Sequence, residues 1–65
     1  MRIYKVTFDG QYKSEPVGWA PNWEVVRVST AGGARKAIKL ATQQVNVEKD
    51  YKIRPAEVQV LAEDD

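Results

Sequence analysis

The chain has 65 residues, which is enough for one domain only. It contains no cysteine and no histidine, so disulfides, zinc sites of the usual Cys/His type and thiol nucleophiles are excluded, as is the commonest general base. The net charge of +1 is unevenly spread, because residues 1–54 carry ten basic against five acidic side chains while residues 55–65 carry four acids.

A domain this small is expected to need stabilisation beyond that of its own hydrophobic core. A domain of this length buries a limited share of its surface, and such domains usually add a disulfide, a metal or a partner subunit. With the first two excluded, we expect a homodimer or a domain that is stable only with its target, and no cofactor.

No apolar run reaches the roughly 18 residues of a membrane span, and the N-terminus lacks the apolar core of a signal peptide. We therefore expect a cytoplasmic protein with no membrane partner.

The first predicted element is a strand over residues 2–8, where apolar and polar side chains alternate with a period of two. One face holds Tyr4, Val6 and Phe8. Asp9-Gly10 then predicts a turn. Residues 9–22 are rich in glycine and proline, and we expect a loop of about a dozen residues that carries Tyr12 and Trp19.

A second strand is predicted over residues 23–29. Val26 and Val28 should face the helix, while Trp23, Val25 and Arg27 should face away. Ser29 or Thr30 is the expected N-cap of a helix over residues 31–45, because a hydroxyl there can accept an orphaned backbone N–H.

The helix has an apolar stripe and a basic face. The stripe consists of Ala34, Ala37, Ile38, Ala41 and Val45, widened by Leu40, and the basic face consists of Arg35, Lys36, Lys39 and Gln43. Gly32 and Gly33 at the helix start allow two interpretations: an anion held at the helix N-terminus, or close packing of the backbone. The spacing is not that of a phosphate loop.

Residues 46–54 form a charged connector that ends at Pro55, and a third strand follows over residues 56–62. Val58, Val60 and Ala62 should share one face, and residues 63–65 should form a frayed acidic end. The order predicts a single α+β domain of ββαβ type, spanning residues 1–65. It has a three-stranded antiparallel sheet, the first strand in the centre, and one helix packed on one face.

One helix cannot cover both faces of that sheet, so the uncovered face is a candidate contact surface for a protein partner or a second subunit. The candidate partner-binding residues on this face and in the long loop are Tyr12, Trp19, Trp23, Val25, Arg27 and Lys5. The aromatic residues Tyr12, Trp19, Trp23 and Tyr51 form a candidate set that could stack on bases or anchor a protein interface. In the other interpretation, Trp19 and Trp23 fold over the open sheet face and complete the core.

A nucleic-acid interface is the alternative function, because the helix has no acidic residue. Its candidate residues are Arg35, Lys36, Lys39, Lys52 and Arg54. We identify no catalytic residues and no metal ligands, and expect a protein that is not an enzyme.

The pattern of the whole chain resembles two groups of small proteins. The features concerned are the Tyr4-x-Val6-x-Phe8 strand, a tryptophan-bearing loop, the Val25-Val26-Arg27-Val28 strand, an alanine-rich helix and Lys52-Ile53-Arg54 before the last strand. One group is the short phage-encoded accessory proteins with a strand-strand-helix-strand plan, which implies binding or inhibition of a host protein. The other is archaeal ribosomal protein LX, which implies binding to ribosomal RNA. Neither resemblance assigns a role to a particular residue.

Overall fold

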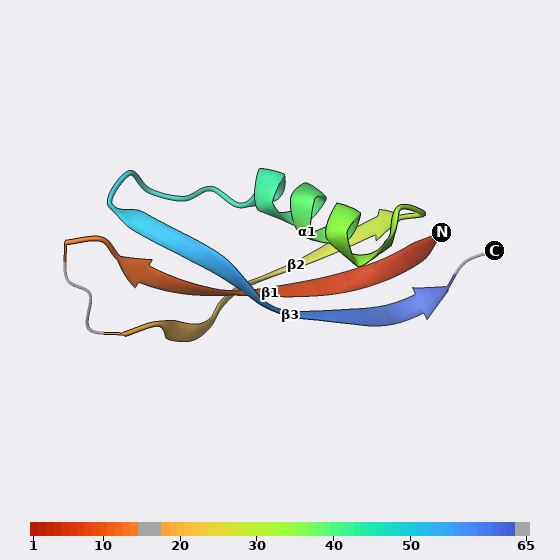
Figure 1. Ribbon diagram of the computed structural model, residues 1–65, viewed down its shortest axis with the longest axis horizontal. Coiled ribbons are helices and arrows are strands. Elements are labelled where there is room, and N and C mark those ends of the chain that lie inside the picture. Colours follow the sequence, from red (N-terminus) through yellow and green to blue (C-terminus); the bar gives the residue numbers. More distant parts are fainter. Residues whose placement is uncertain (15–17, 64–65) are drawn as a thin grey trace.

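The computed structural model describes residues 1–14 and 18–63. It contains β1 (Arg2–Tyr12), β2 (Ala20–Thr30), α1 (Gly33–Gln44) and β3 (Tyr51–Glu63). The three strands form one antiparallel sheet in the order β2-β1-β3, and α1 packs on one face of it (Figure 1). The predicted α+β fold of ββαβ type, with the first strand in the centre, is confirmed.

All three strands are longer than the sequence pattern indicates. The predicted turn at Asp9-Gly10 is wrong, because β1 continues to Tyr12 and Gly10 pairs with Ala20 on one side and Ile53 on the other. The predicted loop over residues 9–22 is too long, because β1 ends at Tyr12 and β2 begins at Ala20; residues 15–17 between them lie outside the described part of the chain. Sheet pairing on both sides of the central strand overrides the local preference of Asp-Gly for a turn.

An irregularity in β2 changes the face on which Trp23 lies. Phe8 pairs with Glu24 but Gly10 pairs with Ala20, so β2 advances by four residues over a stretch in which β1 advances by two. Asn22 takes a left-handed conformation with φ 54° and donates its N–H to Asp9 Oδ1 at 3.2 Å. Trp23 lies within this irregular stretch, where side chains need not alternate regularly between the two faces. Its ring packs 5.0 Å from that of Tyr51, on the side of the sheet that bears α1, so the prediction that Trp23 shares a face with Val25 and Arg27 is wrong.

β3 carries two further irregularities. Tyr4 pairs with Val60 but Ile3 pairs with Ala62, which leaves Leu61 as an extra residue. Val58 and Val60 lie on the α1 side, as predicted, whereas Ala62 lies on the opposite face, against prediction. A second shift, between Thr7 and Phe8, leaves an extra residue just after Pro55, at the edge of the sheet where proline is tolerated.

α1 begins later than predicted and lacks the predicted cap. Its N-cap is Gly32, with no side-chain capping hydrogen bond, and its first residue, Gly33, has φ 86°. The Thr30 hydroxyl does accept a backbone N–H, that of Gly32 at 3.0 Å, but it does so in the turn before the helix. The chain needs this turn to leave the edge strand and reverse over the sheet, so the hydroxyl stabilises the turn rather than the first helical residues.

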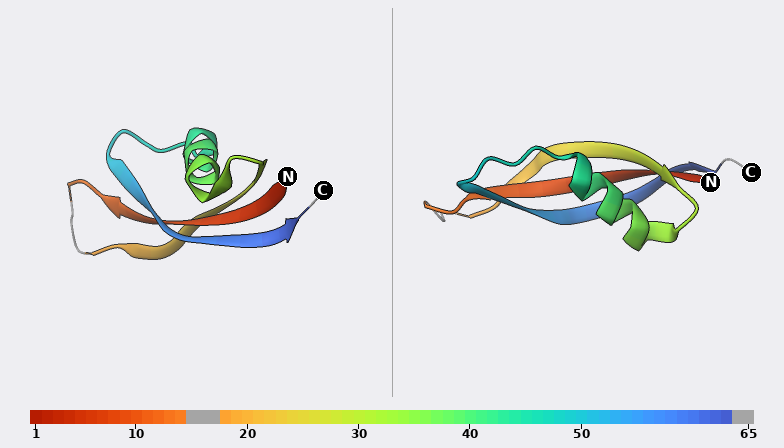
Figure 2. Two further views of the ribbon diagram at one scale, coloured as in Figure 1. Left: turned by 45° about the vertical axis from the view of Figure 1, so that its right-hand side comes forward. Right: turned by 90° about the horizontal axis from the view of Figure 1, so that it is seen from above.

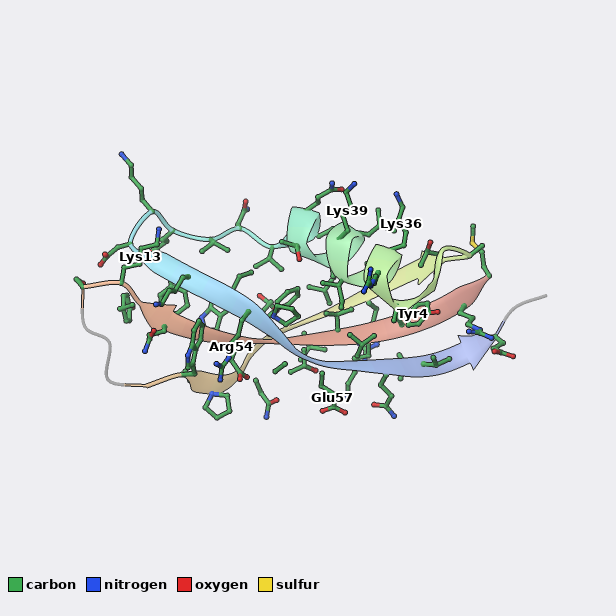
Figure 3. All side chains as sticks on the ribbon, in the orientation of Figure 1. Tyr4, Lys13, Lys36, Lys39, Arg54 and Glu57 are labelled. Carbon is green, nitrogen blue, oxygen red and sulfur yellow. The ribbon has the colours of Figure 1, made fainter. Side chains whose placement is uncertain are left out.

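The core lies between α1 and one half of the sheet, where Figure 3 shows Tyr4 beneath the helix. Its buried apolar members are Tyr4, Val6, Phe8, Val28, Ala37 and Ala41. A helix of 12 residues is about 18 Å long, whereas a strand of 11 residues is about 37 Å long. α1 therefore covers only half of the sheet, and the connector of residues 45–50 runs over the other half, which we call the distal half (Figure 2).

The two described chain ends lie side by side at the covered end of the sheet (Figure 1). Arg2 Nε lies 2.6 Å from Glu63 Oε1, so Glu63, expected to fray, is the last residue of β3, while residues 64–65 lie outside the described part. Hydrogen bonding to Tyr4 and then the charge of Glu63 raise the pKa of Arg2. No helix among the described residues is long and apolar enough to cross a bilayer.

Candidate functional site

The sheet face turned away from α1, here called the open face, has two cations side by side at its centre. Lys5 on β1 and Arg27 on β2 are direct cross-strand partners, and the next pair along is Thr7 with Val25. Arg27 is exposed, Lys5 is half-buried and Val25 is 40% exposed. Like charges directly opposite each other in a sheet are destabilising, so this pair costs the folded state free energy.

Among the described residues, no acid forms an ion pair with either of these two cations. In residues 1–14 and 18–63, the ion pairs join Arg2 to Glu63 and Arg54 to Asp9, and neither includes Lys5 or Arg27. On the open face, Glu57 of β3 lies directly opposite Thr7 of β1 and is not the cross-strand partner of either cation. A cation pair beside an exposed valine therefore stands free to meet an acidic and partly apolar surface.

Trp19 covers the distal half of the open face. Because Trp19 precedes β2 while Lys52 and Arg54 are on β3, its ring must cross the central strand to reach them. Arg54 Cζ lies 4.2 Å and Lys52 Nζ 5.4 Å from the ring centre. Gln11, which faces the same way on β1 and pairs with Lys52, is only 9% exposed. Trp19 thus lies over the open face, as the second interpretation of the tryptophans expected, whereas Trp23 lies on the α1 side, against that interpretation.

Arg54 is engaged on two sides. Its Nη2 lies 3.6 Å from Asp9 Oδ2 while its guanidinium stacks on Trp19. Figure 3 shows Arg54 and Glu57 on the lower side of the sheet, with Lys36 and Lys39 pointing away from it above α1. The structure therefore separates the five candidate nucleic-acid residues into a helix group of Arg35, Lys36 and Lys39 and a sheet group of Lys52 and Arg54.

On the α1 side, the distal half bears a cluster of three aromatic rings. The rings of Tyr12 and Tyr51 have centroids 4.7 Å apart at an angle of 85°, and those of Trp23 and Tyr51 are 5.0 Å apart at 37°. Together with Asn46 and Glu48 of the connector they line a hollow of about 190 Å³, which we call the aromatic hollow. Tyr12 is 53% exposed at its mouth.

Backbone hydrogen bonds fix the connector beside these rings. Tyr51 donates its N–H to the Glu48 carbonyl at 2.9 Å, and Lys13 donates to the Asp50 carbonyl at 2.8 Å. The Ser14 hydroxyl adds a bond to Asp50 Oδ2 at 2.9 Å. Sequence reasoning grouped Tyr12, Trp23 and Tyr51 with Trp19, but it missed Asn46 and Glu48, because only the pairing of Tyr12 with Tyr51 brings the connector beside the rings.

The described part of the chain has no group of three or more acidic, histidine or cysteine side chains that could hold a metal ion. Two candidate surfaces lie on opposite sides of the sheet: a basic one centred on Lys5 and Arg27, and the aromatic hollow, which Glu48 also lines. Comparisons with protein-family models, with curated proteins and with solved structures found no match.

Proposed function

We propose that the protein is a small non-catalytic binding module, with a role like that of a phage-type accessory protein, and that it binds an acidic surface of a protein partner through its open face. The unneutralised pair of Lys5 and Arg27 carries this proposal. A partner carboxylate placed between the two cations would remove their repulsion, and Val25 would supply apolar contact beside it.

The distribution of charge favours a protein over a nucleic acid. Binding along a phosphate backbone needs a continuous track of free cations. Here the helix group and the sheet group lie on opposite sides of the molecule, and Arg54 is already paired with Asp9 and stacked on Trp19. We propose the cytoplasm as the compartment, since a chain without cysteine does not depend on an oxidising environment.

Nucleic-acid binding by the outer face of α1 is the second candidate. Arg35, Lys36 and Lys39 are all exposed, and residues 25–47 contain no acid that would offset them. In a titration with short DNA and RNA followed by NMR, shifts at these three residues that persist at physiological salt would support this candidate in place of the first.

Photo-crosslinking tests the proposed protein partner. A photoreactive residue at Val25 should capture an acidic protein from cell extract, whereas the same residue at Gln43, on the outer face of α1, should not. Arg27→Glu should weaken binding to the captured partner by roughly tenfold or more, because it places an acid against an acid. Lys36→Glu makes the same change of charge on the other side of the molecule and should leave the affinity unchanged.

Two results would contradict the proposal. One is equal capture by the probes at Val25 and Gln43, which would show no preference for the open face. The other is an affinity that Arg27→Glu leaves intact, which would remove the cation pair from the interface.

A further inference from the structure

The aromatic hollow has walls that meet at a steep angle. Tyr12 and Tyr51 stand at 85° to each other, and Trp23 is inclined at 37° to Tyr51. The centroid separations of 4.7 and 5.0 Å are contact distances, so the rings pack against one another, with Tyr12 and Tyr51 edge to face. The ring surfaces left uncovered line the hollow at a steep angle to one another, which suits a compact, rounded group better than a flat guanidinium that stacks along one ring face.

The chemistry of the walls favours a cation. The faces of Trp and Tyr rings carry partial negative charge, and three such rings around a quaternary ammonium form the familiar aromatic cage. Glu48, which carries a full negative charge, and Asn46 also line the hollow.

No cation of the described chain occupies these rings. The cation–ring contacts among the described residues both involve Trp19, on the other side of the sheet. Glu48 makes no ion pair within that part of the chain, where the pairs are Arg2 with Glu63 and Arg54 with Asp9. The ring surfaces that line the hollow and the Glu48 carboxylate are thus left for an external group.

The size of the hollow limits the occupant. Its volume of about 190 Å³ is below the range of about 300–1,000 Å³ that is usual for small-molecule pockets. It has room for the head of a side chain rather than for a whole cofactor.

We infer that the aromatic hollow is a second binding site and that it takes an alkylammonium head group, either the side chain of a lysine, above all a methylated one, or a free quaternary amine. This site is independent of the proposed function, because it lies on the opposite side of the sheet from Lys5 and Arg27. Failure of either proposal leaves the other standing.

A matched pair of probes isolates the contribution of charge. Choline and 3,3-dimethylbutan-1-ol have nearly the same shape, but only choline is charged. In titrations followed by NMR at the Trp23 indole N–H, choline should bind at least about fivefold more tightly than the neutral alcohol. A short peptide with trimethyl-lysine that binds more tightly than choline identifies a protein side chain as the source, and the reverse order identifies a free amine.

Variants locate the site. Glu48→Gln removes an exposed charge without removing a ring, so the fold should persist while choline binding weakens about two- to fivefold. Glu57→Gln makes the same change of charge on the open face and should leave binding unchanged. Tyr12→Leu removes the exposed wall and should weaken choline more than the neutral alcohol.

Three outcomes would overturn the inference. They are equal binding of choline and its neutral analogue, the absence of any shift at Trp23 with choline in large excess, and equal effects of Glu48→Gln and Glu57→Gln. Equal binding of choline and its neutral analogue would show that the hollow binds through apolar contact alone. Equal effects of Glu48→Gln and Glu57→Gln would show that the position of the lost charge does not matter for choline binding.

Discussion

At the scale of single residues, the aromatic hollow depends on a glycine. A Cβ added at Gly10 would lie 2.7 Å from Tyr51 Oη and 2.9 Å from Tyr51 Cζ, closer than such contacts are found. The Tyr51 ring therefore covers the backbone of the central strand at the one position without a side chain. Gly10 serves packing here, and its φ is not in the left-handed region.

Gly10→Ala should destabilise the protein by about 1–3 kcal/mol, the usual cost of forcing extra volume into a packed site. Urea unfolding measures this cost. In a Tyr51→Ala background, the same substitution should cost much less, because the ring that it strikes is gone. Equal costs in the two backgrounds would show that Gly10 does not act through Tyr51.

At the scale of elements, the start of α1 depends on backbone conformation rather than on a cap. Gly33 has φ 86°, in a region that L-residues with a side chain rarely adopt. Gly32 offers no side chain to cap the helix. The pair of glycines thus allows the chain to turn from the edge strand into the helix, which favours the packing interpretation over an anion site.

Gly33→Ala should destabilise the protein by about 1–2 kcal/mol, although alanine usually favours helices over glycine. The reason is that alanine must either adopt the left-handed conformation or unwind the first turn. Thermal or urea unfolding checks this, with Gln43→Ala on the exposed face as a control that should change stability by less than about 0.5 kcal/mol. A more stable Gly33→Ala variant would show that the first turn relaxes at no cost.

Both edge strands of the sheet, β2 and β3, are irregular. β3 carries Pro55 and two register shifts, and β2 carries the irregularity around Asn22. Prolines and bulges on edge strands discourage pairing with another chain. Association of this protein, with itself or with a partner, is therefore expected to use the faces of the sheet rather than its edges.

At the scale of the whole molecule, the core is small for its surface. The molecule extends 45 × 18 × 14 Å, and six apolar side chains are buried among residues 1–14 and 18–63. A domain of this length has a stability of roughly 3–10 kcal/mol, part of which the facing cations offset. A second copy or a partner on the open face would bury more apolar surface and separate those charges.

We expect the unfolding midpoint to rise with protein concentration, because a binding equilibrium that involves only folded chains stabilises them by mass action. Calorimetry over a hundredfold concentration range, with sedimentation to give the mass, measures this effect. A constant midpoint together with a monomer mass would rule out the homodimer and leave an unrelated protein as the partner.

The amino-acid sequence alone determined the fold class and most of the core. The alternation of Tyr4, Val6 and Phe8 and the helical spacing of Ala37 and Ala41 are local periodicities that each assign a face, and the structure buries all five side chains. Among the candidate site residues, Lys5, Val25 and Arg27 lie on the open face as expected, because regular pairing runs from Arg2 to Phe8.

Only the tertiary structure decided the faces of Trp23 and Ala62 and the existence of the aromatic hollow. Each depends on how strands distant in sequence pair. One extra residue in β3 moves Ala62 to the other side of the sheet, and Trp23 lies within the irregular stretch around Asn22, where β2 does not alternate regularly. The sequence pattern contains no signal for such a shift, because its cause is the fit between strands: Asn22 bonded to Asp9, and Tyr51 packed on Gly10.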